Sequence, residues 1–231
     1  YHYYDLLMAL FVTVLLISNV LSSAKIVDLE TSLGPVALVF DAGTLVFPIS
    51  YIFGDVLTEV YGYRRSRRVI WAGFGANVML AVFVWLAGVM PGETEWNDTV
   101  GQTAYNDVLG GISGLIVASL AAYWLGEFSN SYVLAKMKVR TQGRWLWSRT
   151  IGSTLVGQAV DTTVFTVIAT LLGVFSSGIL VSLIVTNYII KVAFEALLTP
   201  VTYRVVSLLK AVEHEDYYDT HTDFNPFKLG V

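Results

Sequence analysis

The sequence has no cysteine and little charge. Of its 231 residues, 14% are Asp, Glu, Lys or Arg, whereas soluble domains carry about 25%. The missing cysteines exclude disulfides, thiolate metal sites and cysteine nucleophiles. Hydrophobic residues make up 55% of the chain, and its mean hydropathy is +0.63. A soluble protein of this composition would expose large apolar patches, so we predict an integral protein of the lipid bilayer.

Motifs for catalysis and nucleotide binding are also missing. The histidines His2, His214 and His221 all lie near the ends of the chain, so none can form a nucleophile–base or metal pair inside an apolar stretch. The sequence has no glycine-rich phosphate loop. We therefore predict no enzymatic activity, no cofactor, no metal and no nucleic-acid partner. The catalytic alternative is a two-aspartate intramembrane protease built from Asp55 and Asp161.

Six apolar stretches are long enough to cross a membrane as helices. They lie at 6–24, 36–61, 69–90, 108–134, 150–174 and 178–209. The second stretch contains Pro48, and the sixth contains Pro200 and is long enough to tilt, kink or project from the bilayer. Strand-type alternation does not run for the length of a barrel strand. The sequence therefore predicts an all-α integral membrane protein with six transmembrane helices.

Basic residues gather on one side of this six-span arrangement. Four arginines lie at 64–68 and five lysines or arginines at 136–149, whereas the acidic segment 91–107 contains neither. The positive-inside rule places the basic segments and both termini in the cytoplasm. This topology explains the arginine run without a nucleic-acid partner. Residues 1–212 are expected to form the membrane domain, and the polar, acidic segment 213–231 a poorly ordered cytoplasmic tail.

Charged side chains interrupt the apolar stretches at helical spacings. Asp55 and Glu59 are four residues apart and share one helix face, and Asn187, Lys191 and Glu195 continue the same spacing in the sixth stretch. Further polar residues at similar depth are Asn19, Glu127, Gln158 and Asp161. Charges inside a bilayer are costly, so we expect these faces to line one central polar cavity.

An alternative interpretation is that these polar groups only join the helices to one another. In that case Lys191 pairs with Glu195 or Glu59. The five acids Asp55, Glu59, Glu127, Asp161 and Glu195 outnumber Lys191, so contacts of this kind leave carboxylates without cationic partners. Those carboxylates must be protonated, hydrated or ready to bind a ligand.

Small residues recur at every fourth position of the fourth stretch, at Gly110, Gly114, Ala118, Ala122 and Gly126. A ridge of this kind lets another helix approach closely. That helix can belong to the same chain or to a second copy, so a homodimer is an alternative to internal packing.

Four segments carry a family resemblance. Residues 47–62 read FPISYIFGDVLTEVYG and are followed by the arginine run. Further segments are 19–25, 157–162 (GQAVDT), 187–191 (NYIIK) and the continuation of the last one to residue 200. Together they resemble the queuosine precursor transporter family, also called the vitamin uptake transporter family. The resemblance covers the chain apart from the tail and the acidic loop.

The resemblance implies a six-helix importer in the inner (plasma) membrane. Its implied substrates are 7-cyano-7-deazaguanine and 7-aminomethyl-7-deazaguanine, which are salvaged for transfer RNA modification. It also implies a helix arrangement similar to the substrate-binding subunits of energy-coupling-factor transporters. One alternative is a binding subunit that needs a separate ATPase module. Another is import of a different planar nitrogen base or vitamin.

The residues in the apolar stretches suit a deazaguanine. One carboxylate can accept hydrogen bonds from both N1–H and the 2-amino group, and we assign this role first to Asp161, with Gln158 beside it. An aromatic ring can stack on the base, and the candidates are Phe53, Trp124 and Tyr188. The other candidate binding residues are Asp55, Glu59, Glu127, Asn187, Lys191, Glu195 and Asn19. For Glu59, an ion pair with Arg64 or Arg65 is an equal alternative.

Overall fold

The computed structural model describes residues 1–33, 36–110 and 112–228. Its long helices are α1 (Tyr4–Ala24), α2 (Phe47–Tyr61), α3 (Tyr63–Val89), α6 (Ile112–Thr141), α7 (Leu146–Leu171) and α8 (Leu180–Glu213). The short elements are β1 (Ile26–Leu33), β2 (Val36–Asp41), η1 (Ala42–Leu45), α4 (Thr94–Thr99), α5 (Gly101–Tyr105), η2 (Asn106–Gly110) and η3 (Ser177–Ile179).

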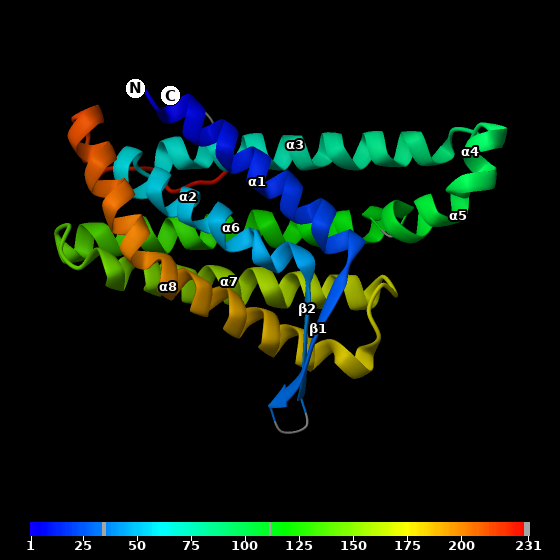
Figure 1. The fold of residues 1–231 in the computed structure, drawn as a ribbon. Helices are drawn as coiled ribbons and strands as arrows, with labels where there is room; N and C mark the ends of the chain where they lie inside the picture. Colours follow the sequence, from blue (N-terminus) through cyan, green and yellow to red (C-terminus); the bar gives the residue numbers. More distant parts are fainter. Residues whose placement is uncertain (34–35, 111, 229–231) are drawn as a thin grey trace.

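The long helices lie side by side in one bundle with two distinct ends (Figure 1). Both chain termini, the α2–α3 junction and the α6–α7 connection lie at one end, which we call the terminal end. The antiparallel β1–β2 hairpin, α4, α5 and the α7–α8 connection lie toward the other, which we call the hairpin end (Figure 1). The basic segments predicted to share one side of a membrane are therefore at one end of the bundle.

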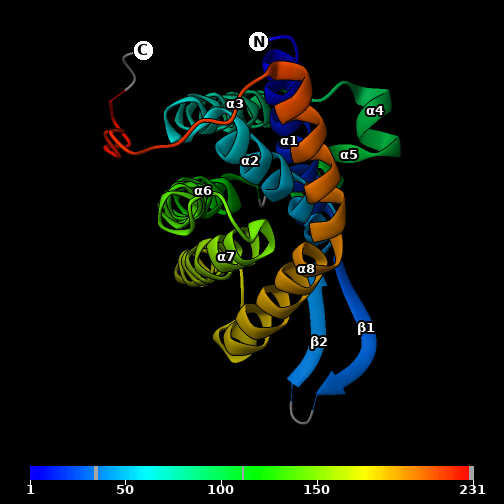
Figure 2. The ribbon, with the colours of Figure 1, turned by 90° about the vertical axis from the view of Figure 1, so that its left-hand side faces the viewer.

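Helix α2 occupies the centre of the bundle. It contacts α1, α3, α6 and α8, and the view along the bundle shows these helices around it (Figure 2). Its side chains are buried nearly all round, including Tyr51, Val56 and Val60 at 0% exposure. The charged members of α2, Asp55 and Glu59, are equally buried. The segment with the strongest family resemblance is thus the core of the molecule.

The prediction of one helix over 36–61 is wrong. Residues 36–41 form strand β2, paired with β1, and the helix begins only at Phe47. A helix through the whole stretch would put Pro48 in its interior, where proline removes a backbone hydrogen bond. In the structure Pro48 falls in the first turn of α2, where proline is well tolerated. The hairpin also corrects the all-α expectation, although the fold is mostly helical.

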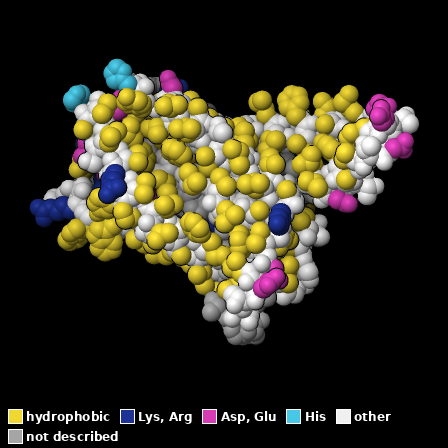
Figure 3. Space-filling view, viewed as in Figure 1, with side chains coloured by type: hydrophobic (Ala, Val, Ile, Leu, Met, Phe, Trp, Pro, Cys, Tyr) yellow, Lys and Arg dark blue, Asp and Glu magenta, His cyan; other side chains and the backbone are white. Residues whose placement is uncertain are grey.

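The outer surface of the bundle is apolar. Large side chains such as Phe83 on α3 and Leu197 on α8 are 62% and 73% exposed, and hydrophobic side chains cover most of the face in Figure 3. Acidic side chains appear at the α4–α5 extremity of that face. Among the residues that the structure describes, four helical segments are long and apolar enough to cross a membrane: Tyr4–Ala24, Tyr63–Val89, Leu146–Leu171 and Ser177–Glu213. An apolar surface of this extent on long helices is typical of a membrane protein.

The acidic tail packs against the terminal end of the bundle. The carboxylate of Asp219, 4% exposed, accepts the backbone N–H of Tyr63 at 3.0 Å. The indole N–H of Trp71 donates to the carbonyl of Pro226 at 2.8 Å. These contacts differ from the poorly ordered tail that the composition predicts, because the tail supplies acceptors to the start of α3.

The ridge of small residues packs inside the chain where the structure describes it. Ala118 and Ala122 are buried, and a Cβ on Gly126 would lie 2.7 Å from Cβ of Asp161 on α7. Gly110 and Gly114 lie outside the residues whose side-chain surroundings are described. The described part of the ridge therefore brings α6 against α7.

Candidate functional site

Four layers of polar side chains follow one another along α2 and its neighbours. Phe47, Tyr51, Asp55 and Glu59 repeat every four residues on α2 and span about 18 Å along its axis. The polar stripe of α8 runs beside them in the same direction, since Asn187 contacts Thr44 just before α2 and Lys210 contacts Glu59 near its end. We describe the layers from the hairpin end to the terminal end.

The first layer surrounds Asp41 at the end of β2. Its carboxylate accepts hydrogen bonds from the hydroxyls of Ser22 at 2.5 Å and Thr44 at 2.9 Å, and from the backbone N–H of Thr44 at 3.2 Å. The Thr44 hydroxyl also donates to the side-chain oxygen of Asn187 at 3.3 Å. Asn19 lies nearby, donating to Asn77 at 2.7 Å and accepting from Ser119 at 2.6 Å. Sequence reasoning did not select Asp41, because the residue was assigned to an uninterrupted apolar helix.

The second layer contains an ion pair between α7 and α8. The ammonium of Lys191 lies 2.9 Å from the Asp161 carboxylate and 4.2 Å from the centroid of the Phe47 ring. Both charged residues are buried, at 7% and 4% exposure. The alternative interpretation paired Lys191 with Glu195 or Glu59, but its partner in the structure is Asp161.

A small cavity of about 30 Å³ joins the first two layers. Its lining includes Asn19, Asp41, Thr44, Phe47, Asp161, Phe165 and Lys191. This volume is close to one water molecule's share of the liquid, so the site is closed against a bicyclic base in this conformation. The lining supplies carboxylates, an ammonium and two aromatic rings, which are the groups needed to bind a planar, hydrogen-bonding molecule.

The third layer consists of acids without cationic partners. Asp55 accepts a hydrogen bond from the Asn130 amide at 2.7 Å. Glu127 and Glu195 are 0% and 1% exposed, and no carboxylate oxygen of either has a hydrogen-bond partner among the described residues. The amide of Gln158, 0% exposed, likewise lacks a partner in the part of the chain that the structure describes.

The fourth layer surrounds Glu59 with cations. Its carboxylate lies 2.7 Å from the Arg149 guanidinium, 2.8 Å from Lys210 and 3.6 Å from Lys138. Asp216 of the tail joins the cluster, 2.6 Å from Lys138 and 2.8 Å from Lys210. The ion-pair interpretation of Glu59 thus gains support, with these three cations as its partners; Arg65 instead lies 3.9 Å from Glu215.

The charge on Asp216 responds to these neighbours. Its partial burial acts to raise the pKa of the carboxyl group, but the hydrogen bonds from Lys138 and Lys210 outweigh burial, and the pKa is lowered. Asp216 is therefore an anion at neutral pH and ties the tail to the two lysines that also contact Glu59.

The structure places the three predicted aromatic residues away from the cavity lining. Trp124 packs against Phe128 and Phe227, with ring centroids 5.1 and 5.4 Å apart. Phe53 packs on the hydrophobic core, and the Tyr188 hydroxyl donates to the carbonyl of Leu155 at 3.3 Å. The aromatic residues that reach the polar layers are instead Phe47, Tyr51 and Phe165. The four-residue spacing from Asp55 back to Tyr51 and Phe47 is the signal that would have found the first two.

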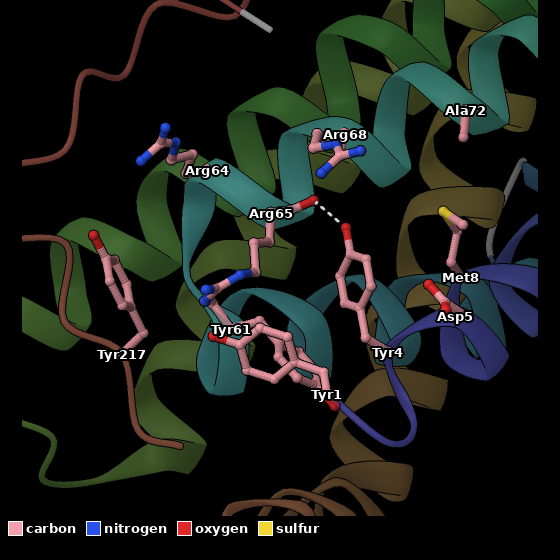
Figure 4. A pocket seen from close by; sticks show the side chains of 10 residues that line it. All are labelled: Tyr1, Tyr4, Asp5, Met8, Tyr61, Arg64, Arg65, Arg68, Ala72 and Tyr217. Carbon is pink, nitrogen blue, oxygen red and sulfur yellow. Dashed lines mark hydrogen bonds between the residues drawn. The ribbon is translucent and has the colours of Figure 1, made fainter. Parts of the chain in front are cut away.

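A second cavity, of about 540 Å³, opens at the terminal end between α1, α3 and the tail (Figure 4). It is lined by arginines and tyrosines, with the Arg65 guanidinium 4.2 Å from the centroid of the Tyr1 ring. Burial raises the pKa of the Tyr1 hydroxyl. Its described lining includes none of the predicted binding residues, so the polar layers remain the candidate site.

Metal binding has no support from the donor geometry. Among residues 1–33, 36–110 and 112–228, no three His, Cys, Asp or Glu side chains are placed to hold a metal ion together. The carboxylates of the third layer must therefore be balanced in another way.

Comparison with known proteins decides the family. A family model described as "Putative vitamin uptake transporter" matches residues 41–205, which contain Asp41, Asp161, Glu127 and Glu59, one acid from each of the four polar layers. The chain belongs to this family. Its members are transporters, so the chain is a transporter and not an enzyme, as the resemblance in 47–62 implied.

A relative from Bacillus subtilis (strain 168), named "Probable queuosine precursor transporter", is 29% identical over 200 residues. The alignment covers 86% of this chain and 82% of the relative. No solved structure matches the chain. The match extends over most of both proteins, so it does not rest on one motif.

Proposed function

We propose that this transporter imports the queuosine precursors 7-cyano-7-deazaguanine and 7-aminomethyl-7-deazaguanine across the inner membrane. The observation that carries the proposal is the buried Asp161–Lys191 pair beside the Phe47 ring. It offers an acceptor, a donor and an aromatic face within one cavity. The name of the Bacillus subtilis relative supports the same substrate class.

The chemistry of the base matches this set of groups. The Asp161 carboxylate accepts from N1–H and the 2-amino group, while Lys191 or Asn187 donates to the O6 carbonyl. Phe47 or Phe165 stacks on the ring. The cation of the aminomethyl form requires a second carboxylate, which Asp41 supplies at the other side of the cavity. In the closed cavity Asp161 and Lys191 satisfy each other, so the base enters by separating them as the helices move apart.

We further propose six membrane crossings with both termini in the cytoplasm. Helices α1, α3, α6, α7 and α8 are each long enough to cross the core of a bilayer, which is about 30 Å thick. Helix α2 is about 22 Å long, and η1 extends it toward the hairpin end. The basic residues of the terminal end support a cytoplasmic location for that end.

The proposal is tested by uptake of radiolabelled deazaguanine into proteoliposomes that contain only this chain. We expect uptake by the wild-type chain and a loss of more than about 100-fold for Asp161→Asn, because an amide presents an N–H where the base needs an acceptor. Asp98→Asn, on exposed α4, is the matched control and should transport normally. Normal uptake by Asp161→Asn would contradict the assignment of Asp161.

The same experiment separates the alternatives. A binding subunit that depends on a separate ATPase module would bind the base in detergent and fail to transport it alone. An importer of another planar base or vitamin would transport that molecule, and an excess of it would reduce uptake of the radiolabelled deazaguanine. Guanine is the informative competitor, because it has the same hydrogen-bonding edge and lacks the 7-substituent.

A further inference from the structure

Three buried acids of the third layer have no cationic partner among the described residues. Asp55 on α2, Glu127 on α6 and Glu195 on α8 are 0%, 0% and 1% exposed. Each lies close enough to the other two for their charges to interact. They converge from three helices onto one place, although they are far apart in the sequence.

The surrounding groups supply little compensating charge. Asp55 accepts a hydrogen bond from the Asn130 amide, which is neutral. The titratable groups that face the cluster are Tyr51, Tyr123 and Asp161. Lys191 lies beyond Asp161 and is paired to it. Three ionised carboxylates in this place would have no cation of their own among the described residues.

A second, independent observation points to an occupant of this space. The Tyr51 hydroxyl is fully buried and has no hydrogen-bond partner in the described residues. It lies beside the cluster, since a Cβ on Gly126, the residue before Glu127, would meet the Tyr51 oxygen at 2.9 Å. Buried donors and acceptors nearly always form hydrogen bonds, so the space at this cluster is suited to a polar occupant.

Neither a metal ion nor the substrate alone satisfies these acids. No three acidic or histidine side chains of the described residues are placed to hold a metal ion. The aminomethyl precursor brings one positive charge and the cyano precursor brings none, so at least two carboxylates would stay unbalanced. A buried carboxylate without a counter-charge takes up a proton instead.

We propose that Asp55, Glu127 and Glu195 form a proton-binding site, and that protons bound there enter the cell with the substrate. The coupling rests on the proposed import function, whereas the protonation does not. The cluster lies between the cavity of the first two layers and the Glu59 ion-pair cluster of the terminal end. A proton reaches a carboxylate from the cavity side and leaves it toward the cytoplasm when the terminal end opens.

Protonation is tested first without any substrate. Dicyclohexylcarbodiimide reacts with protonated carboxyl groups in apolar surroundings, and the modified residue is located by mass spectrometry of the purified chain. We expect labelling at one or more of the three acids near neutral pH. Glu59, equally buried and in ion pairs with Lys138, Arg149 and Lys210, is the internal control and should not be labelled.

A stability measurement guards against limited access of the reagent. Glutamine has the shape of a protonated glutamate, so Glu127→Gln and Glu195→Gln should leave the thermal midpoint in detergent unchanged or raised. Glu59→Gln should lower it. Labelling of Glu59 alone, or a lowered midpoint in Glu127→Gln and Glu195→Gln, would overturn the proton-binding site.

Coupling is tested in proteoliposomes with radiolabelled 7-cyano-7-deazaguanine. An inward proton gradient should stimulate wild-type uptake, and substrate addition should raise the external pH. The reference is the exchange of labelled for unlabelled substrate in the absence of a gradient. In Glu127→Gln we expect the ratio of gradient-driven uptake to this exchange to fall about tenfold or more. Wild-type uptake that does not respond to the proton gradient would overturn the coupling while leaving import intact. Absence of all uptake would instead contradict the proposed function.

Discussion

At the scale of single residues, similar buried carboxylates have different neighbours. Glu59 contacts three cations, Asp161 contacts one, and Glu127 contacts none among the residues that the structure describes. All three are buried in helices of one bundle. Burial alone therefore does not say whether an acid is structural, binds a ligand or holds a proton.

The ion pairs of Glu59 lead to a prediction for stability. Glu59→Gln leaves Arg149 buried without its anionic partner, so we expect the free energy of unfolding to fall by about 3 kcal/mol. Thermal unfolding of the purified chain in detergent measures the change. Glu95→Gln, on exposed α4, is the control and should leave the midpoint where it is. An unchanged thermal midpoint in Glu59→Gln would show that the ion pairs of Glu59 contribute little to the free energy of unfolding.

At the scale of elements, the tail completes the helix that follows α2. Gly62 ends α2 with a positive φ of 85°, a conformation that favours glycine. Tyr63 then starts α3 directly, so its backbone N–H has no acceptor within its own helix. Asp219 provides that acceptor from 156 residues further along the chain. The charge of Asp219 also favours the N-terminal end of the helix dipole.

This contact predicts that the tail and α3 depend on each other. Asp219→Ala should lower the free energy of unfolding by about 1–2 kcal/mol, the usual cost of losing a helix N-cap. It should also speed hydrogen exchange in residues 213–228 and at the start of α3. Asp223→Ala, an exposed acid in the same tail whose partner is Lys228, is the matched control. Equal hydrogen-exchange rates in the two variants would argue that the tail does not cap the N-terminus of α3.

At the scale of the whole molecule, the two ends of the bundle differ in charge while the surface between them is apolar. The terminal end carries the arginine run and the lysines of α6, and α4 carries Glu95 and Asp98. Acidic side chains mark that extremity of the molecule in Figure 3. This asymmetry gives the bundle a preferred orientation in a bilayer.

The orientation is tested by single cysteines, which the cysteine-free sequence makes simple to introduce. Asp98 on α4 and Arg140 on α6 are both exposed. In intact cells, a membrane-impermeant maleimide should label Asp98→Cys, and it should label Arg140→Cys only after the membrane is opened. The reverse pattern would place the termini outside.

The sequence by itself determined the class of the protein and most of its helices. In lipid, the backbone N–H and C=O groups of an apolar segment must form hydrogen bonds within that segment, and a helix allows this. Composition and the length of the apolar runs were therefore sufficient to predict α1, α3, α6, α7 and α8 as helices. Four-residue spacing likewise placed Asp55 with Glu59, and Asn187 with Lys191 and Glu195, because a helix repeats its faces locally.

Only the tertiary structure decided which of these faces meet. The pairing of Lys191 with Asp161 and the cations around Glu59 depend on contacts between helices that are distant in sequence. The hairpin at 26–41 depends on pairing between two strands, which local hydropathy does not record. Spacing along one helix is a local property, whereas the partner of a buried charge is set by how the helices pack.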